Sequence, residues 1–173
     1  MNLPFAVLLF PTRGMETLPH THSCFVCGDA NPIGLQLRFV KDGPVVRTQF
    51  TPATGHAGFR GVVHGGILST VLDEIMVWAC AVNSGHFGFC AELNVRFHQP
   101  ALPGEELSIS AELVSNHRDR LFTAKAEVRN PSGKLLASGT GKYMALRRVD
   151  EAALLDDFVG SPEVIESWKQ NSG

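Results

Sequence analysis

The chain has 173 residues, of which 44% are hydrophobic and 18% are charged, and its formal net charge at pH 7 is -2. This composition is typical of one domain large enough to bury a sizeable core. The near-neutral balance argues against a basic surface for nucleic acid, and no run of about 18 apolar residues indicates a membrane-spanning helix.

Residues 1–23 are predicted to be a mobile N-terminal extension of the domain. Residues 3–10 are apolar, but they lack the basic flank and the small-residue cleavage site of a signal peptide. Met15 offers an alternative natural start. Without a secretory signal, a cytoplasmic location is expected for the chain, and its cysteines are expected to be reduced thiols.

Four possible zinc ligands follow at residues 20–27 in the pattern H-x-H-x-C-x-x-C, namely His20, His22, Cys24 and Cys27. A single C-x-x-C pair is a weak metal signature, and the two histidines fall in the extension. We therefore predict no metal site and no cofactor, and keep these four residues as the alternative ligand set.

Two strands are predicted at residues 34–41 and 45–51, where apolar and polar side chains alternate. The sequence "DGP" between them indicates a hairpin turn. The glycine-rich residues 52–63 are predicted to be a loop.

A long helix follows, in which apolar residues from Ile67 to Cys80 recur at three- and four-residue spacing. The sequence "NSG" at residues 83–85 predicts its end. Four further strands are predicted at residues 93–97, 107–113, 122–128 and 134–146, and their short turns make neighbours antiparallel. Residues 150–170 are predicted to form two short helices, the second opened by Ser161.

This order of elements predicts an α+β domain at residues 24–148, followed by a C-terminal tail at residues 149–173. A single apolar helix has to bury its stripe against the face of the six-stranded antiparallel sheet. The sequence shows no internal repeat and no second domain.

The start of the helix carries the residue types of a catalytic site. His64 and Gly65 lie where unpaired backbone N–H groups point outward, and glycine lets a ligand oxygen approach them closely. Asp73 lies eight residues further on, in an otherwise apolar run, and a carboxylate there can act as general base or nucleophile. Eight residues of helix span about 12 Å, so the two groups cannot converge within one chain if the helix is regular. Either Asp73 is unrelated to the helix start, or a second copy of the chain brings its own helix start next to it. The second option predicts a catalytic homodimer.

The stretch "GVVHGGILSTVLDE" resembles the signature of hotdog-fold acyl-CoA thioesterases of the PaaI-like and 4-hydroxybenzoyl-CoA thioesterase type. The resemblance implies a hotdog fold, a homodimer or homotetramer with active sites at the subunit interface, and acyl-CoA as substrate. It also implies that the Gly65 N–H polarises the thioester carbonyl beside His64, while Asp73 of the partner subunit is base or nucleophile. Glu74 would then be structural.

The chain departs from that pattern at two positions. Gly58 stands where many relatives carry Asn or Gln, and Cys90 stands where many carry Ser or Thr. The resemblance places both near the substrate, together with Gly66. Met76 and Trp78 are predicted to line the acyl pocket. Three cations are candidate contacts for the coenzyme A phosphates: Arg118, Arg120 and Lys142.

Three alternatives stay open at this point. Cys90 could be the nucleophile, although no neighbouring base can be identified in the sequence. The domain could bind acyl-CoA without catalysis, or act as a hotdog dehydratase or hydratase. The segment "CFVCG…NPIGLQL" also resembles a structural leader that precedes the first strand in some hotdog thioesterases.

Overall fold

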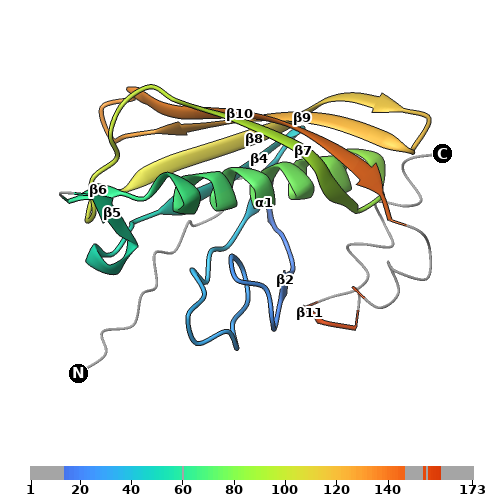
Figure 1. The fold of residues 1–173 in the computed structure, drawn as a ribbon. Coiled ribbons are helices and arrows are strands. Elements are labelled where there is room, and N and C mark those ends of the chain that lie inside the picture. Colours follow the sequence, from blue (N-terminus) through green and yellow to red (C-terminus); the bar gives the residue numbers. More distant parts are fainter. Residues whose placement is uncertain (1–13, 60, 147–153, 155, 161–173) are drawn as a thin grey trace.

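A computed structural model describes residues 14–59, 61–146, 154 and 156–160. One long helix, α1 (Gly65–Ser84), packs against one face of a large antiparallel sheet (Figure 1). The strands of this sheet run in the order β1-β3-β4-β8-β9-β10-β7. Their bounds are Met15–Thr17 (β1), Val40–Asp42 (β3), Val45–Phe50 (β4), Gly88–Phe97 (β7), Leu107–His117 (β8), Leu121–Arg129 (β9) and Leu135–Ala145 (β10). The α+β hotdog fold predicted from the sequence is confirmed.

Shorter elements complete the described part of the chain. β2 (His20–Thr21) pairs with β11 (Phe158–Val159), and β5 (Ala57–Phe59) pairs with β6 (Val62–Val63). A single 3-10 turn, Thr54–His56, precedes β5. Residues 52–63, expected to be loop throughout, therefore contain a small hairpin, and Gly61 makes its turn at a φ of 74°.

The helix forms as its sequence predicts and ends where glycine is needed. Eleven of its side chains are buried, and Gly85 closes the C-terminus in the left-handed conformation at a φ of 73°. By length and composition alone α1 could cross a membrane, but 56% of its most apolar window is buried inside the protein. It is the core helix of the fold.

The sheet differs from the prediction at its first edge. Only Val40 and Lys41 of the predicted strand 34–41 belong to β3, because Leu35 and Leu37 instead donate backbone hydrogen bonds to Phe25 and Val26, each at 2.8 Å. β1 then pairs with β3 and becomes a seventh strand that the sequence did not predict. The domain boundaries at residues 24 and 148 stay predictions.

The segment that leads into β3 and the segment that contains β11 lie on the side of α1 away from the sheet (Figure 1). The buried Trp78 of α1 joins them, since its ring lies 6.1 Å from Phe39 and 5.7 Å from Phe158 between centroids. Most of the predicted tail helices lie outside the described residues, and β11 was not predicted. Both faces of α1 are thus covered near its middle.

Candidate active site

The first turn of α1 leaves one backbone donor available. His64 is the N-cap residue, and its Nδ1 accepts a 2.9 Å hydrogen bond from the Gly66 N–H. The Ile67 N–H donates to the His64 carbonyl at 3.0 Å. Among the described residues no acceptor pairs with the Gly65 N–H, so this group can meet an incoming oxygen.

A cavity of about 450 Å³ opens beside Gly65. Its walls include Leu68 of α1, Phe97 at the end of β7, and Pro100 and Ala101 in the following connection. A Cβ atom at position 65 would lie 3.0 Å from the Phe97 ring, so glycine keeps the approach to the N–H open. A mostly apolar wall with one convergent polar group is typical of a small-molecule site.

The acyl-pocket prediction for Met76 and Trp78 does not agree with this cavity. Both side chains are buried in the core, with exposed fractions of 0% and 2%, and neither lines the cavity. Leu68 and Phe97 take that position instead.

Gly58 is one of the two positions where the chain departs from the resembled family pattern, and packing explains why glycine stands there. A Cβ atom at this position would lie 2.7 Å from Cδ2 of His64 and 3.1 Å from its Cα. A Cβ atom at Gly66 would likewise lie 2.8 Å from the His64 Nδ1. The two glycines therefore make room for the histidine that caps the helix.

Asp73 faces β10 and β7 from the middle of α1. The hydroxyl of Tyr143 donates a 2.9 Å hydrogen bond to Asp73 Oδ1. Tyr143 is completely buried, and burial, reinforced by the Asp73 carboxylate, raises the pKa of its phenol far above the usual range. A Cβ atom at Gly141 would collide with the tyrosine ring, so this glycine makes space for it. A neutral tyrosine thus holds the carboxylate in place.

Cys90 is the direct cross-strand neighbour of Tyr143 and also contacts Asp73. Burial, followed by the hydrogen bond and negative charge of Asp73, raises the pKa of the Cys90 thiol to about 11. Because the thiolate is the nucleophilic form, this environment disfavours the alternative in which Cys90 attacks the substrate. Its thiol is placed to orient Asp73.

The two halves of the candidate site lie apart within one chain. α1 is continuous from Gly65 to Ser84, so Gly65 and Asp73 keep their separation of about 12 Å along the axis. Along β7, Phe97 flanks Gly65 at one end and Cys90 flanks Asp73 at the other. A single chain therefore offers a carbonyl-polarising half and a carboxylate half.

The three candidate phosphate contacts lie away from the cavity of their own chain. Arg118 and Arg120 are exposed in the turn between β8 and β9, which touches the end of β10 through a hydrogen bond from the Ala145 N–H to the Arg120 carbonyl. Lys142 is exposed on β10 and forms a 2.8 Å ion pair with Glu92 of β7. None of the three contacts Asp73 or Gly65.

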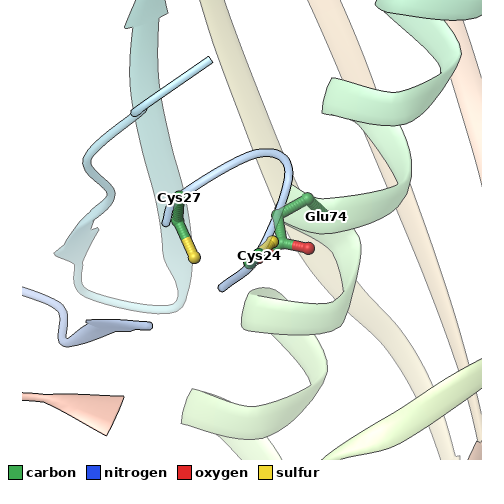
Figure 2. A group of neighbouring side chains, drawn as sticks. All are labelled: Cys24, Cys27 and Glu74. Carbon is green, nitrogen blue, oxygen red and sulfur yellow. The ribbon is translucent and has the colours of Figure 1, made fainter. Parts of the chain in front are cut away.

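The four residues of the alternative zinc-ligand set do not form one cluster in the structure. Nδ1 of His22 and Nε2 of His20 lie 2.9 and 3.4 Å from the Asp29 carboxylate, whereas Cys24 and Cys27 face Glu74 of α1 (Figure 2). No local pattern in the sequence connects Glu74 with the cysteines, because 46 residues separate Cys27 from Glu74.

Comparison with known proteins finds thioesterases. Residues 60–137 match the family model described as the thioesterase superfamily. A crystal structure of a thioesterase superfamily protein is 27% identical, with a TM-score of 0.66 over 72% of this chain and 60% of that chain. The chain is therefore similar to thioesterase superfamily proteins over its helix and the strands that follow it.

Two further relatives bear on the site. Acyl-coenzyme A thioesterase 13 of Homo sapiens is 29% identical over 85 residues, which are 49% of this chain and 61% of that protein. The chain thus spans less than two thirds of the length of this curated relative. A Streptococcus mutans structure bound to acetyl CoA shares the fold, with 17% identity and a TM-score of 0.59 over 64% of this chain and 88% of that chain.

Proposed function

We propose that this protein hydrolyses the thioester bond of an acyl-CoA and releases the free acid and coenzyme A. The observation that carries the proposal is the unpaired Gly65 N–H in an apolar cavity, matched by a carboxylate, Asp73, that a buried tyrosine holds. The human relative's name and the acetyl CoA bound to the Streptococcus mutans protein support this choice of substrate.

In the proposed reaction, the thioester carbonyl oxygen accepts a hydrogen bond from the Gly65 N–H, which stabilises the negative charge of the tetrahedral intermediate. With Asp73 as general base, the carboxylate takes a proton from water as the water oxygen attacks the carbonyl carbon. The C–S bond then breaks, and the coenzyme A sulfur leaves with the proton. With Asp73 as nucleophile, the carboxylate attacks the carbonyl carbon, the C–S bond breaks and the coenzyme A thiolate leaves, which gives an acyl-aspartyl anhydride; water then hydrolyses the anhydride to the free acid and the Asp73 carboxylate, and the released proton goes to the thiolate. Tyr143 and Cys90 position the carboxylate in either case.

The two halves meet if two copies pair through β7. This ten-residue strand ends the sheet, and in the described part of the chain its outer edge pairs with no strand. Such an edge is a template for another chain. Phe97 beside Gly65 and Cys90 beside Asp73 are equidistant in sequence from the point of β7 between Leu93 and Asn94. A two-fold axis there would bring Gly65 close to Asp73 of the partner subunit.

The same pairing gives the surface cations a role. It would bring the turn that carries Arg118 and Arg120 toward the partner's cavity, where the coenzyme A phosphates could bind. Lys142 would first have to leave its ion pair with Glu92. We place this reaction in the cytoplasm, with a homodimer or homotetramer as the active form and no nucleic acid or membrane partner.

The decisive experiment measures thiol release from short, long and aromatic acyl-CoAs by wild type and Asp73→Asn. Removal of the base or nucleophile is expected to lower kcat by roughly 10²- to 10⁴-fold while acyl-CoA binding is retained. Asp42→Asn makes the same chemical change in an exposed ion pair with Arg47 and should leave both quantities unchanged. Equal rates in wild type and Asp73→Asn would contradict the mechanism. Binding without turnover in wild type would identify an acyl-CoA-binding protein instead.

A further inference from the structure

Three metal-ligating side chains meet on the side of α1 away from the sheet. The Cys24 and Cys27 sulfurs and a Glu74 carboxylate oxygen all lie within 4.8 Å of one another, the one such group among the described residues (Figure 2). Ligand atoms around a tetrahedral zinc ion lie roughly 3.5–3.8 Å apart. A contraction of at most about 1.3 Å on each pair of atoms would therefore form three corners of a zinc site.

The turn that carries the cysteines is shaped to present both sulfurs to the same point. The Gly28 N–H donates to the Cys24 carbonyl at 2.9 Å, and the Val26 N–H lies 3.2 Å from the Cys24 sulfur. A Cβ atom at Gly28 would collide with the Cys24 carbonyl oxygen, so only glycine lets the turn close. Backbone N–H groups directed at a sulfur favour its thiolate, which is the form that binds metal.

Polar neighbours also orient the other two ligands. The Trp78 Nε1–H donates a 3.1 Å hydrogen bond to Glu74 Oε1. The Thr21 hydroxyl lies 3.6 Å from the Cys27 sulfur and accepts a hydrogen bond from the Cys24 N–H at 3.1 Å. Outer contacts of this kind fix the direction of metal ligands.

The surroundings of the cluster favour a bound cation. Cys27 is completely buried. Arg38 donates a 2.8 Å hydrogen bond to the Cys27 carbonyl oxygen rather than to its sulfur. A divalent ion bound by the three side chains would neutralise two thiolates and a carboxylate in this position.

We propose that Cys24, Cys27 and Glu74 bind a thiophilic divalent cation, with zinc as the best fit to two sulfurs and one carboxylate oxygen. The described residues supply three ligand atoms, which leaves the fourth tetrahedral position for water. The site differs from the four-residue set suggested by the sequence, because His20 and His22 bind Asp29 instead.

This ion would join two parts of the chain that are distant in sequence. The cysteines belong to the segment that crosses α1 on the side away from the sheet, and Glu74 belongs to the middle of α1 (Figure 1). Glu74 is also the neighbour of Asp73, which faces the opposite strands. The ion would therefore connect α1 to the N-terminal segment.

The test is metal analysis of the full chain, produced without a histidine tag, together with the absorption spectrum after cobalt substitution. We expect about one zinc per chain, and a cobalt spectrum with thiolate-to-metal charge transfer. Cys24→Ser and Cys27→Ser should each lose about half of that absorption or lose the metal altogether. Glu74→Gln, which preserves side-chain volume, should weaken zinc affinity at least 10-fold.

The His20→Ala/His22→Ala double variant is the matched control and should retain full zinc content. Wild-type protein that binds neither zinc nor cobalt would overturn the proposal, as would a Cys24–Cys27 disulfide found by mass spectrometry in freshly purified protein. Zinc that is lost in the histidine variant but kept in Glu74→Gln would also overturn it. None of these readouts depends on thioesterase activity, so this proposal and the proposed function can fail separately.

Discussion

At the scale of single residues, glycines and one tyrosine define the candidate site as much as the acid does. Gly65 lets the Phe97 ring lie close to the helix terminus, Gly58 makes room for His64, and Gly141 makes room for Tyr143. At each of these three positions, an added Cβ atom would lie 3.0 Å or less from a neighbouring side chain. Substitution at these positions would therefore move groups that face the substrate or the carboxylate.

The role of the Gly65 N–H can be isolated because Gly65 is the first residue of α1. Proline is tolerated there, and His64 has the extended conformation, φ -61° and ψ 131°, that a residue before proline adopts. Gly65→Pro deletes the N–H without breaking the helix, and it should lower kcat roughly 10²- to 10³-fold. Circular dichroism and thiol release measure the two effects.

Gly65→Ala is the matched control, because it adds a Cβ atom but keeps the N–H. Its Cβ atom would press on the Phe97 ring at 3.0 Å, so we expect a partial loss that is clearly smaller than that of Gly65→Pro. Equal losses in the two variants would mean that the cavity needs space at this position rather than a hydrogen-bond donor.

At the scale of elements, sequence periodicity predicts the helix and the long strands well, because local pattern and tertiary burial agree there. The helix from Gly65 to Ser84 and the strand Val45–Phe50 are examples. Periodicity fails at residues 34–39, whose apolar side chains are buried by an irregular segment that bonds to Phe25 and Val26. Alternation shows which side chains are inside, but not which backbone pairs with them.

The sequence likewise identifies only some residues of the candidate site. His64, Gly65 and Asp73 could be identified because they share one helix and a known spacing. Tyr143 could have been placed beside Asp73 only from strand parity, which puts it on the same side of β10 as Gly141 and Gly139. The Cys24–Glu74 contact depends on how an irregular segment crosses α1, and no local pattern in the sequence encodes that.

β7 is the element on which the dimer prediction depends. If its outer edge pairs with its own copy, a two-fold axis perpendicular to the sheet passes through Leu93 or Asn94, since paired residues must share a face. Asn94→Cys should then form an intersubunit disulfide on mild oxidation. If the axis passes through Leu93, a mixture of Asn94→Cys and Glu92→Cys should cross-link instead. Non-reducing electrophoresis measures both.

Ser108→Cys is the control, because Ser108 is exposed on β8 in the middle of the sheet, where both edges of the strand are occupied. It should not cross-link beyond the level that the native thiols give in wild type. Failure of both the Asn94→Cys protein and the mixture to cross-link would exclude β7 pairing.

At the scale of the whole molecule, the distance along α1 means that a single chain cannot bring the two proposed catalytic groups together. Gly65 and Asp73 belong to opposite halves of the site, and a rigid core helix between the sheet and the N-terminal segment holds them apart. A closed two-fold dimer would complete two sites at once, each with the N–H of one subunit and the carboxylate of the other. Catalysis would then require assembly.

Co-expression of two inactive variants tests this requirement directly. In a heterodimer of Gly65→Pro and Asp73→Asn, a shared-site arrangement leaves one site with both native groups and one with neither. Random pairing makes half of the dimers mixed, so about a quarter of wild-type activity should return. If each site belonged to one chain, every site would carry one lesion, and no activity would return.

Co-expression of wild type with the Gly65→Pro/Asp73→Asn double variant gives the reciprocal result. Shared sites leave both sites of a mixed dimer inactive and about a quarter of the activity overall, whereas sites within single chains leave about half. Thiol release from the two purified mixtures, each normalised to wild-type dimer, therefore shows whether the active site crosses the subunit interface.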